Sequence, residues 1–234
     1  MWMENSLDEL EHRIGYCFKD RMLLKQALTH SSFSNEQKIN KIKDYERLEF
    51  LGDAVLELAS SEFLYEEYPD LSEGELTKKR STLVCAPSLA FCARDIDLAG
   101  YIRLGKGEEA TGGRGRESII SDVMEAVIGA IYLDGGYKDA VRFVRQFILS
   151  DLENKQLFYD SKTLLQEYVQ KDSRATLHYV VVGESGPDHA KEFAVEVMIN
   201  GQVLGRGIGK TKKAAEQQAA YEALLVSGGK QRCI

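Results

Sequence analysis

Long apolar runs are missing from this sequence of 234 residues. No segment approaches the roughly 18 to 20 consecutive apolar residues of a membrane span. Charged residues interrupt the stretch from Met1 to Tyr16 throughout, which is not typical of a secretory signal. With 44% hydrophobic residues, the chain has the apolar content of one or two packed domains. We therefore expect a soluble, cytoplasmic protein without a membrane partner.

Cysteine and histidine are also scarce, with four of each. The cysteines lie at irregular spacings and form no Cys-x-x-Cys pair, and the histidines do not complete a zinc-binding spacing. The pattern favours reduced cysteines that mostly serve packing. These are Cys17, Cys85, Cys92 and Cys233.

Basic residues are in deficit, because 30 Lys and Arg face 37 Asp and Glu, for a net charge of -7. Such a balance first suggests that the partner is not a nucleic acid. The deficit is uneven, however. Residues 1–160 hold 20 basic and 29 acidic side chains, whereas residues 161–234 hold 10 basic and 8 acidic ones. The charge of the whole chain therefore misrepresents both parts.

The first 150 residues predict consecutive helices separated by polar breaks, with Pro69 and Pro87 between helices. A glycine-rich loop is expected at 105–115; it lacks the preceding strand and the following Lys-Ser/Thr of a phosphate-binding loop. The predicted helices are 6–13, 21–30, 45–65, 73–84, 88–97, 118–133 and 138–152.

The remainder predicts an α-β-β-β-α order. Helices are expected at 161–171 and 211–225, and strands at 177–184, 192–199 and 202–208, with a hairpin turn at Asn200-Gly201. In the middle strand, Phe193, Val195, Val197 and Ile199 should face a core. The expected domains are therefore an all-α domain at 1–152, a linker at 153–160, an α+β domain at 161–229 and a tail at 230–234.

Two predicted helices carry carboxylates on an otherwise apolar surface. At 100° per residue, Glu46, Glu49 and Asp53 share a stripe about 60° wide. Asp122 and Glu125 lie three residues apart on the second helix. A helix that is apolar nearly all round is expected to be buried. Because burying an unpaired carboxylate is costly and these helices contain almost no basic residue, bound cations are expected to compensate.

Oxygen-only ligands favour Mg²⁺, with Mn²⁺ as a substitute, over zinc. Alternatively, Glu46 and Glu49 lie at a solvated helix edge and Asp122 is an early-turn acid favoured by the helix dipole. We favour the metal interpretation because two independent helices carry the same anomaly. Spacing alone leaves the reaction open, since helical isoprenoid synthases and nucleotide-cleaving phosphohydrolases also hold magnesium with helical carboxylates.

A lysine cluster stands at the start of the last predicted helix, where free N–H groups and the helix dipole also favour anions. For the lysines alone, a solvated helix start is the alternative. A polar turn and the first helix of this domain could add two contact regions, with donors and acceptors that suit the minor groove of double-stranded RNA. The candidates are Gln166, Glu167, Gln170, His189, Lys210, Lys212 and Lys213.

The stretch Glu46-Arg47-Leu48-Glu49-Phe50-Leu51-Gly52-Asp53-Ala54 resembles the signature of bacterial ribonuclease III. The resemblance continues through Glu73-Gly74 and 118–129. The segments 162–167, 186–189 and 210–215 are similar to a double-stranded RNA-binding domain, and Thr163 joins the RNA-binding candidates on this basis. The resemblance implies a magnesium-dependent endonuclease that cuts both RNA strands, leaving 5′-phosphates and short 3′ overhangs, and that processes rRNA, mRNA and other structured RNA.

The resemblance also implies roles for individual residues. Glu49, Asp53, Asp122 and Glu125 would be the metal ligands, with Asp53 and Glu125 foremost in catalysis. Glu46 and Glu73 would be supporting acids, although Glu73 also lies in a capping box that alone explains it. Phe50 would insert across the interface of a homodimer, with an ordinary core phenylalanine as the alternative.

The sequence departs from the family pattern at Tyr45, where Asn is common, and at Leu177, where Pro is often found. The rival functions are a duplex-RNA-binding protein that does not cleave and, more remotely, a magnesium-dependent helical lyase or synthase. An intact set of acids argues against the first, and the RNA-binding segments argue against the second.

Overall fold

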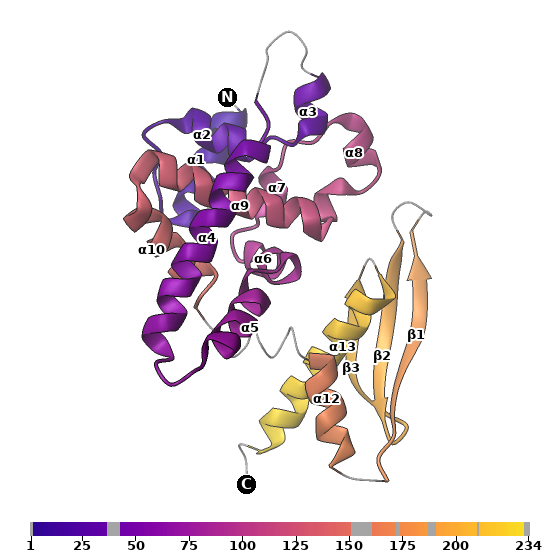
Figure 1. Ribbon diagram of the computed structural model, residues 1–234. Helices are drawn as coiled ribbons and strands as arrows, with labels where there is room; N and C mark the ends of the chain where they lie inside the picture. Colours follow the sequence, from indigo (N-terminus) through magenta and orange to yellow (C-terminus); the bar gives the residue numbers. More distant parts are fainter. Residues whose placement is uncertain are drawn as a thin grey trace. The chain divides into compact units, whose positions relative to one another are not determined.

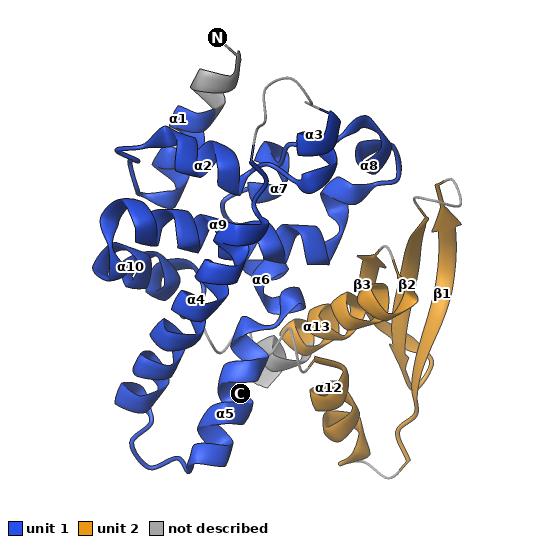
Figure 2. Cartoon of the chain, turned by 45° about the horizontal axis from the view of Figure 1, so that its top comes forward, with its two compact units in different colours: residues 1–150 blue, residues 151–234 orange. Residues whose placement is uncertain are grey.

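The computed structural model describes residues 2–36, 43–150, 161–171, 174–186, 191–209 and 211–231. The chain divides into two compact units, residues 1–150 and residues 151–234 (Figure 2). The first unit is helical in its described parts, and the second combines two helices with an antiparallel sheet. Expected positions that fall outside the described residues are the linker, His189, Lys210 and the last three residues of the tail.

The helices of the first unit surround α9, which is its most buried element (Figure 1). Helix α9 contacts α2, α4, α6 and α10. Its side chains from Val123 to Ile131 are fully buried at seven positions, as the apolar pattern of 118–133 predicted. The bounds are α1 Trp2–Ile14, α2 Arg21–Ala27, α3 Ser31–Glu36, α4 Glu46–Glu67, α5 Glu73–Val84, α6 Ala86–Ala93, α7 Leu98–Tyr101, α8 Lys106–Ala110, η1 Gly113–Gly115, α9 Glu117–Gly135 and α10 Tyr137–Phe147.

Several expected bounds differ, since the helices expected at 6–13, 88–97 and 138–152 are Trp2–Ile14, Ala86–Ala93 and Tyr137–Phe147. Three further expectations were wrong for a clear physical reason. The helix expected at 21–30 ends at Ala27, because His30 N–H donates to the Arg103 carbonyl at 3.0 Å and Arg103 N–H donates to that of Leu28 at 2.7 Å. The loop expected at 105–115 contains α8 and η1, which ion pairs between two arginines and two glutamates stabilise. Pro87 lies in the first turn of α6, where a missing N–H costs nothing, and does not separate helices.

Helices α4 and α9 cross with their backbones in contact, because each carries a glycine at the crossing. A Cβ atom added at Gly52 would lie 1.8 Å from the carbonyl oxygen of Glu125. One added at Gly129 would lie 2.3 Å from the carbonyl oxygen of Leu48. Real Cβ contacts essentially never fall below 3.0 Å, so only glycine allows this approach. The crossing places the first turns of α4 beside the middle of α9.

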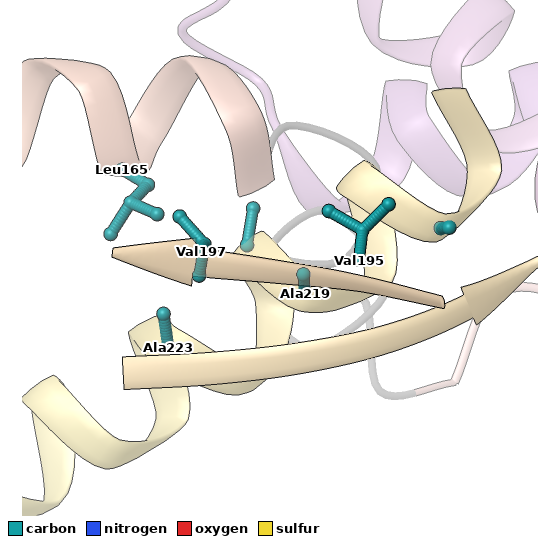
Figure 3. Packing of buried hydrophobic residues seen from close by; sticks show 7 residues of the cluster. Leu165, Val195, Val197, Ala219 and Ala223 are labelled. Carbon is teal, nitrogen blue, oxygen red and sulfur yellow. The ribbon is translucent and has the colours of Figure 1, made fainter. Parts of the chain in front are cut away.

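The second unit packs α12 (Ser161–Gln170) and α13 (Lys212–Gln231) on a three-stranded sheet of order β1-β2-β3. The strands are β1 Leu177–Ser185, β2 Glu192–Ile199 and β3 Gln202–Gly209. Val195 and Val197 are buried between the sheet and the helices, as the alternation predicted, against Leu165, Ala219 and Ala223 (Figure 3). The observed order confirms the α+β prediction for this part of the chain.

No helix in the described ranges combines the length and the apolar character that a membrane crossing requires.

Candidate active site and RNA-binding surface

The α4–α9 crossing brings the predicted carboxylates into electrostatic contact. Burial, together with the negative charges of Asp53, Glu49 and Asp122, raises the pKa of Glu125 to about 8. Burial also raises the pKa of Glu49, with additional contributions from Asp122, Glu46 and Asp53. Acids that are distant in sequence therefore form one cluster, which we call the acidic cluster: Glu49, Asp53, Asp122 and Glu125.

The acidic cluster lies at the edge of the helical core. Glu49, Asp122 and Glu125 are half-buried, whereas Asp53 and Glu46 are exposed. The expectation of five buried carboxylates was therefore wrong, because α4 buries only part of its circumference. Half-burial still removes enough water to raise the pKa of Asp122, against hydrogen bonds from Tyr45 and Ser121 and the charge of His30, which lower it.

No lysine or arginine of the described residues forms an ion pair with the acidic cluster. The nearby Arg80 of α5 pairs instead with Glu57 at 2.7 Å, and Glu57 contributes a further negative charge that acts on Glu125. The repulsion within the cluster is thus left without a lysine or arginine partner among these residues, and the charge of His30 acts on Asp122 by lowering its pKa. A bound cation offsets such repulsion.

The donor set fits a hard divalent cation, because it consists only of carboxylate oxygens. Among the described residues, no three His, Cys, Asp or Glu side chains are already arranged as a metal cage. Mg²⁺ seldom uses such cages in proteins; it is usually held by one or two carboxylates together with waters and substrate phosphates. An open group of acids is therefore the arrangement expected for a magnesium site that shares its ion with a phosphate substrate.

Glu73 stands apart from the acidic cluster. It begins α5 beside a capping box formed by Ser72 and Glu75, and its carboxylate accepts a hydrogen bond from Thr77 at 3.1 Å. It is not among the acids whose charges raise the pKa of Glu49 or Glu125. The local contacts are those of a helix start, in keeping with the structural alternative for this residue.

Three large apolar side chains on one side of α4 are exposed. Phe50 is 81% exposed, Leu58 57% and Tyr65 77%, and all three project from the same side of the helix. The alternative that Phe50 is an ordinary core residue was wrong. We call this exposed stripe the α4 apolar face.

The RNA-binding candidates of the second unit are solvent-accessible wherever the structure describes them. The candidates on α12 recur at the spacing of a single helix face, opposite the buried Leu165 and Val169. Lys212 and Lys213 are exposed at the first turn of α13, whose start Thr211 caps by accepting from Ala214 N–H at 3.1 Å. The exposed candidates on α12 are Thr163, Gln166, Glu167 and Gln170.

Two side chains beside the acidic cluster were missed by the sequence reasoning. The Tyr45 hydroxyl donates to Asp122 Oδ2 at 3.3 Å. The rings of Tyr45 and His30 lie 5.7 Å apart. Nothing in the spacing marks His30, since it approaches the site only through the backbone contacts that follow α2. The single available signal for Tyr45 was its departure from the family pattern.

Two family models match the chain. The model described as "Ribonuclease-III-like" matches residues 20–152, and the one described as "Double-stranded RNA binding motif" matches residues 161–226. A helical unit with an acidic cluster, followed by this RNA-binding fold, defines an endonuclease that acts on double-stranded RNA. The chain belongs to the ribonuclease III family.

Named relatives agree. "Ribonuclease 3" of Listeria monocytogenes serotype 4a (strain HCC23) is 49% identical over 222 residues, covering 94% of this chain and 97% of the relative. "Ribonuclease 3" of Shouchella clausii (strain KSM-K16) is 46% identical over 230 residues, covering 97% and 88%. The nuclease domain of ribonuclease III from Campylobacter jejuni, solved with a flexible region involved in dimer formation, matches with a TM-score of 0.57 and 42% identity, covering 61% of this chain and 95% of that one. The protein is thus an endoribonuclease of a metal-dependent family.

Proposed function

We propose that this endoribonuclease requires Mg²⁺, for which Mn²⁺ can substitute, and hydrolyses both strands of duplex RNA to leave 5′-phosphates and short 3′ overhangs. The observation that carries the proposal is the acidic cluster, whose carboxylates raise the pKa of Glu49 and Glu125 without a lysine or arginine partner among the described residues. Glu49, Asp53, Asp122 and Glu125 hold the metal, and Asp53 and Glu125 lie closest to the chemistry. Glu46 and Glu73 have supporting roles along the RNA path.

When bound, the metal supplies Lewis acidity, an activated water and charge neutralisation at the scissile phosphate. The side chains fix where this chemistry occurs, since the glycine crossing holds the α4 and α9 acids at one place. Their negative charge also repels RNA phosphate by itself. Productive binding of the substrate at this site therefore requires the cation.

The second unit holds the duplex. Lys212 and Lys213 face the phosphates from the start of α13, and Lys210 completes their set. The α12 candidates and His189 contact the minor groove, where 2′-hydroxyls distinguish RNA from DNA. Recognition by shape suits many substrates, and structured precursors of rRNA and mRNA are the class we propose.

The active form is a homodimer. The α4 apolar face supports this, because a stripe of large apolar side chains beside an acidic site is unfavourable in water and is buried when two copies meet. Two copies related by a two-fold axis carry two acidic clusters, which matches the cutting of two RNA strands.

Chelation tests the metal requirement. A long RNA duplex labelled at its ends is incubated with the full chain in excess EDTA and again after Mg²⁺ is restored. We expect no cleavage with EDTA, and with Mg²⁺ we expect products with 5′-phosphates and short 3′ overhangs. Cleavage that persists after thorough chelation would refute the metal mechanism, and a single-stranded RNA of the same sequence serves as the control substrate.

A further inference from the structure

We propose that Tyr45 is a positioning residue for the active site, because its hydroxyl fixes the carboxylate of Asp122 across the α4–α9 crossing. The inference rests on the proposed metal role of Asp122. It goes beyond that role by assigning a function to a position where this chain departs from the family pattern.

Tyr45 occupies the N-cap of α4 but does not cap the helix. Its backbone is already helical, at φ -81° and ψ -17°, and its side chain makes no capping hydrogen bond. Asp44 accepts from Glu46 N–H at 3.3 Å in its place. An asparagine at this position would suit the cap but is too short to extend to α9. Tyr45 therefore does not cap α4, and its side chain contacts α9 instead.

The Tyr45 side chain is held on several sides. It is only 4% exposed, and its N–H donates to the Thr29 carbonyl at 2.9 Å. Its ring packs against His30, which is itself fixed because Ser32 N–H donates to its Nδ1 at 3.1 Å. A ring fixed in this way presents its hydroxyl at one place, 3.3 Å from Asp122 Oδ2.

The hydroxyl can act only as a donor toward Asp122. A phenol keeps its proton at neutral pH and an ionised carboxylate only accepts, so the hydrogen bond runs from Tyr45 to Asp122. The hydrogen bond occupies one lone pair of Oδ2 and restricts the rotation of the carboxylate. The carboxylate oxygens keep further lone pairs for a cation, and a hydrogen bond of this kind is how outer groups orient metal ligands.

The test compares three single variants and one double variant of the full chain by direct Mn²⁺ binding, measured by electron paramagnetic resonance without RNA. Tyr45→Phe keeps the ring and removes the hydroxyl. Tyr16→Phe is the matched control, because the Tyr16 hydroxyl donates to Asp134 at 2.6 Å. Asp122→Ala removes the proposed ligand. We expect Tyr45→Phe to weaken Mn²⁺ binding about tenfold, Tyr16→Phe to leave it unchanged, and Tyr45→Phe to have no further effect in the Asp122→Ala background.

The outcomes distinguish a failure of the Tyr45 inference from a failure of the proposed metal role of Asp122. If Asp122→Ala weakens Mn²⁺ binding and Tyr45→Phe does not, the Tyr45 inference is wrong and the metal role of Asp122 stands. If Asp122→Ala binds Mn²⁺ like the unmodified chain, the metal role fails and the inference fails with it. A second measurement does not depend on whether Tyr45→Phe folds. NMR of ¹³Cζ-labelled tyrosine compares the Tyr45 resonance of the unmodified chain with that of Asp122→Ala. An unchanged resonance would show that Tyr45 does not contact Asp122.

Discussion

Within the acidic cluster, Glu125 is the residue whose pKa folding changes most clearly. Its pKa rises from 4.5 to about 8 because it leaves water among three other carboxylates. Between these two pH values the native carboxyl keeps a proton that the unfolded chain has lost. The native state therefore binds more protons, and the free energy of unfolding falls as pH rises through this window.

The first prediction follows from that sign. In EDTA, unfolding by urea at pH 5 and at pH 8 should show lower stability at pH 8. Glu125→Gln should raise the free energy of unfolding at pH 8 by on the order of 1 kcal/mol, discounted for the solvent that screens a half-exposed group. At pH 5 the same substitution should be nearly neutral. A variant that is equally stable or less stable at pH 8 would show that Glu125 is not strained by its neighbours.

At the residue scale, the sequence identified the acids but not their surroundings. Helical periodicity places Glu49 and Asp53 on one face and Asp122 and Glu125 on another, and this is enough to suspect a cluster. It does not reveal that Asp53 is exposed, or that Tyr45 contacts Asp122 across 77 residues of sequence. Contacts of this kind depend on how two helices cross, which the pattern of one helix does not contain.

At the element scale, the crossing of α4 and α9 is the feature that builds the site. Gly52 and Gly129 are the residues that permit it, since a methyl group at either would collide with the opposite backbone. The close approach sets the separation of the acids on the two helices. We therefore expect stability and activity to depend on the same two glycines.

The second prediction concerns Gly129→Ala. The added methyl should force the helices apart and lower the free energy of unfolding by about 1 to 3 kcal/mol, with loss of cleavage beyond the unfolded fraction. Gly74→Ala is the matched control, because a Cβ there meets nothing within 4 Å and should be neutral or stabilise by up to about 1 kcal/mol. Urea unfolding and duplex cleavage measure both effects. Equal free energies of unfolding and equal cleavage rates for Gly129→Ala and Gly74→Ala would contradict the close approach of α4 and α9.

The third prediction concerns the start of α13. Replacing Lys212 and Lys213 together by alanine should weaken the binding of duplexes of any sequence and reduce the slope of log affinity against log salt by about 2. Lys138→Ala on α10 should change the slope little. Fluorescence anisotropy with several duplexes at several salt concentrations measures this. Loss of affinity for only one sequence would be inconsistent with recognition of shape and phosphate.

Strands and long helices were predictable, and short helices were not. The alternation at 193–199 and the apolar run at 118–133 each dominate their segment, so local pattern and tertiary packing agree there. In contrast, α3, α7, α8 and η1 are short and depend on distant partners, such as the pairing of Thr29 with Arg103. For this reason the helix expected at 21–30 ends three residues early, and the segment expected to be a loop at 105–115 contains two short helices.

At the scale of the whole molecule, charge is divided between two tasks. Much of the acidic excess lies in the unit that carries the acidic cluster, and the lysines at α13 lie in the double-stranded RNA-binding unit. The net charge of -7 is therefore compatible with an RNA enzyme, because the placement of charge decides what each unit binds.

The fourth prediction tests the dimer. Phe50→Ala should raise the dissociation constant of the homodimer at least about tenfold, because a large exposed aromatic at the centre of an interface is a typical hot spot. Met22→Ala is the control, since Met22 is an exposed apolar side chain (63%) of α2 and not part of the α4 apolar face. Light scattering across a dilution series gives the masses. An unchanged dissociation constant for Phe50→Ala would exclude that face as the interface.

The most direct test of the central claim, that the acidic cluster carries out the cleavage, compares the unmodified chain with Glu125→Gln on one labelled duplex in Mg²⁺. We predict that both bind the duplex with similar affinity and that Glu125→Gln cuts it at least about a hundredfold more slowly. Cleavage by Glu125→Gln at the rate of the unmodified chain would contradict the claim.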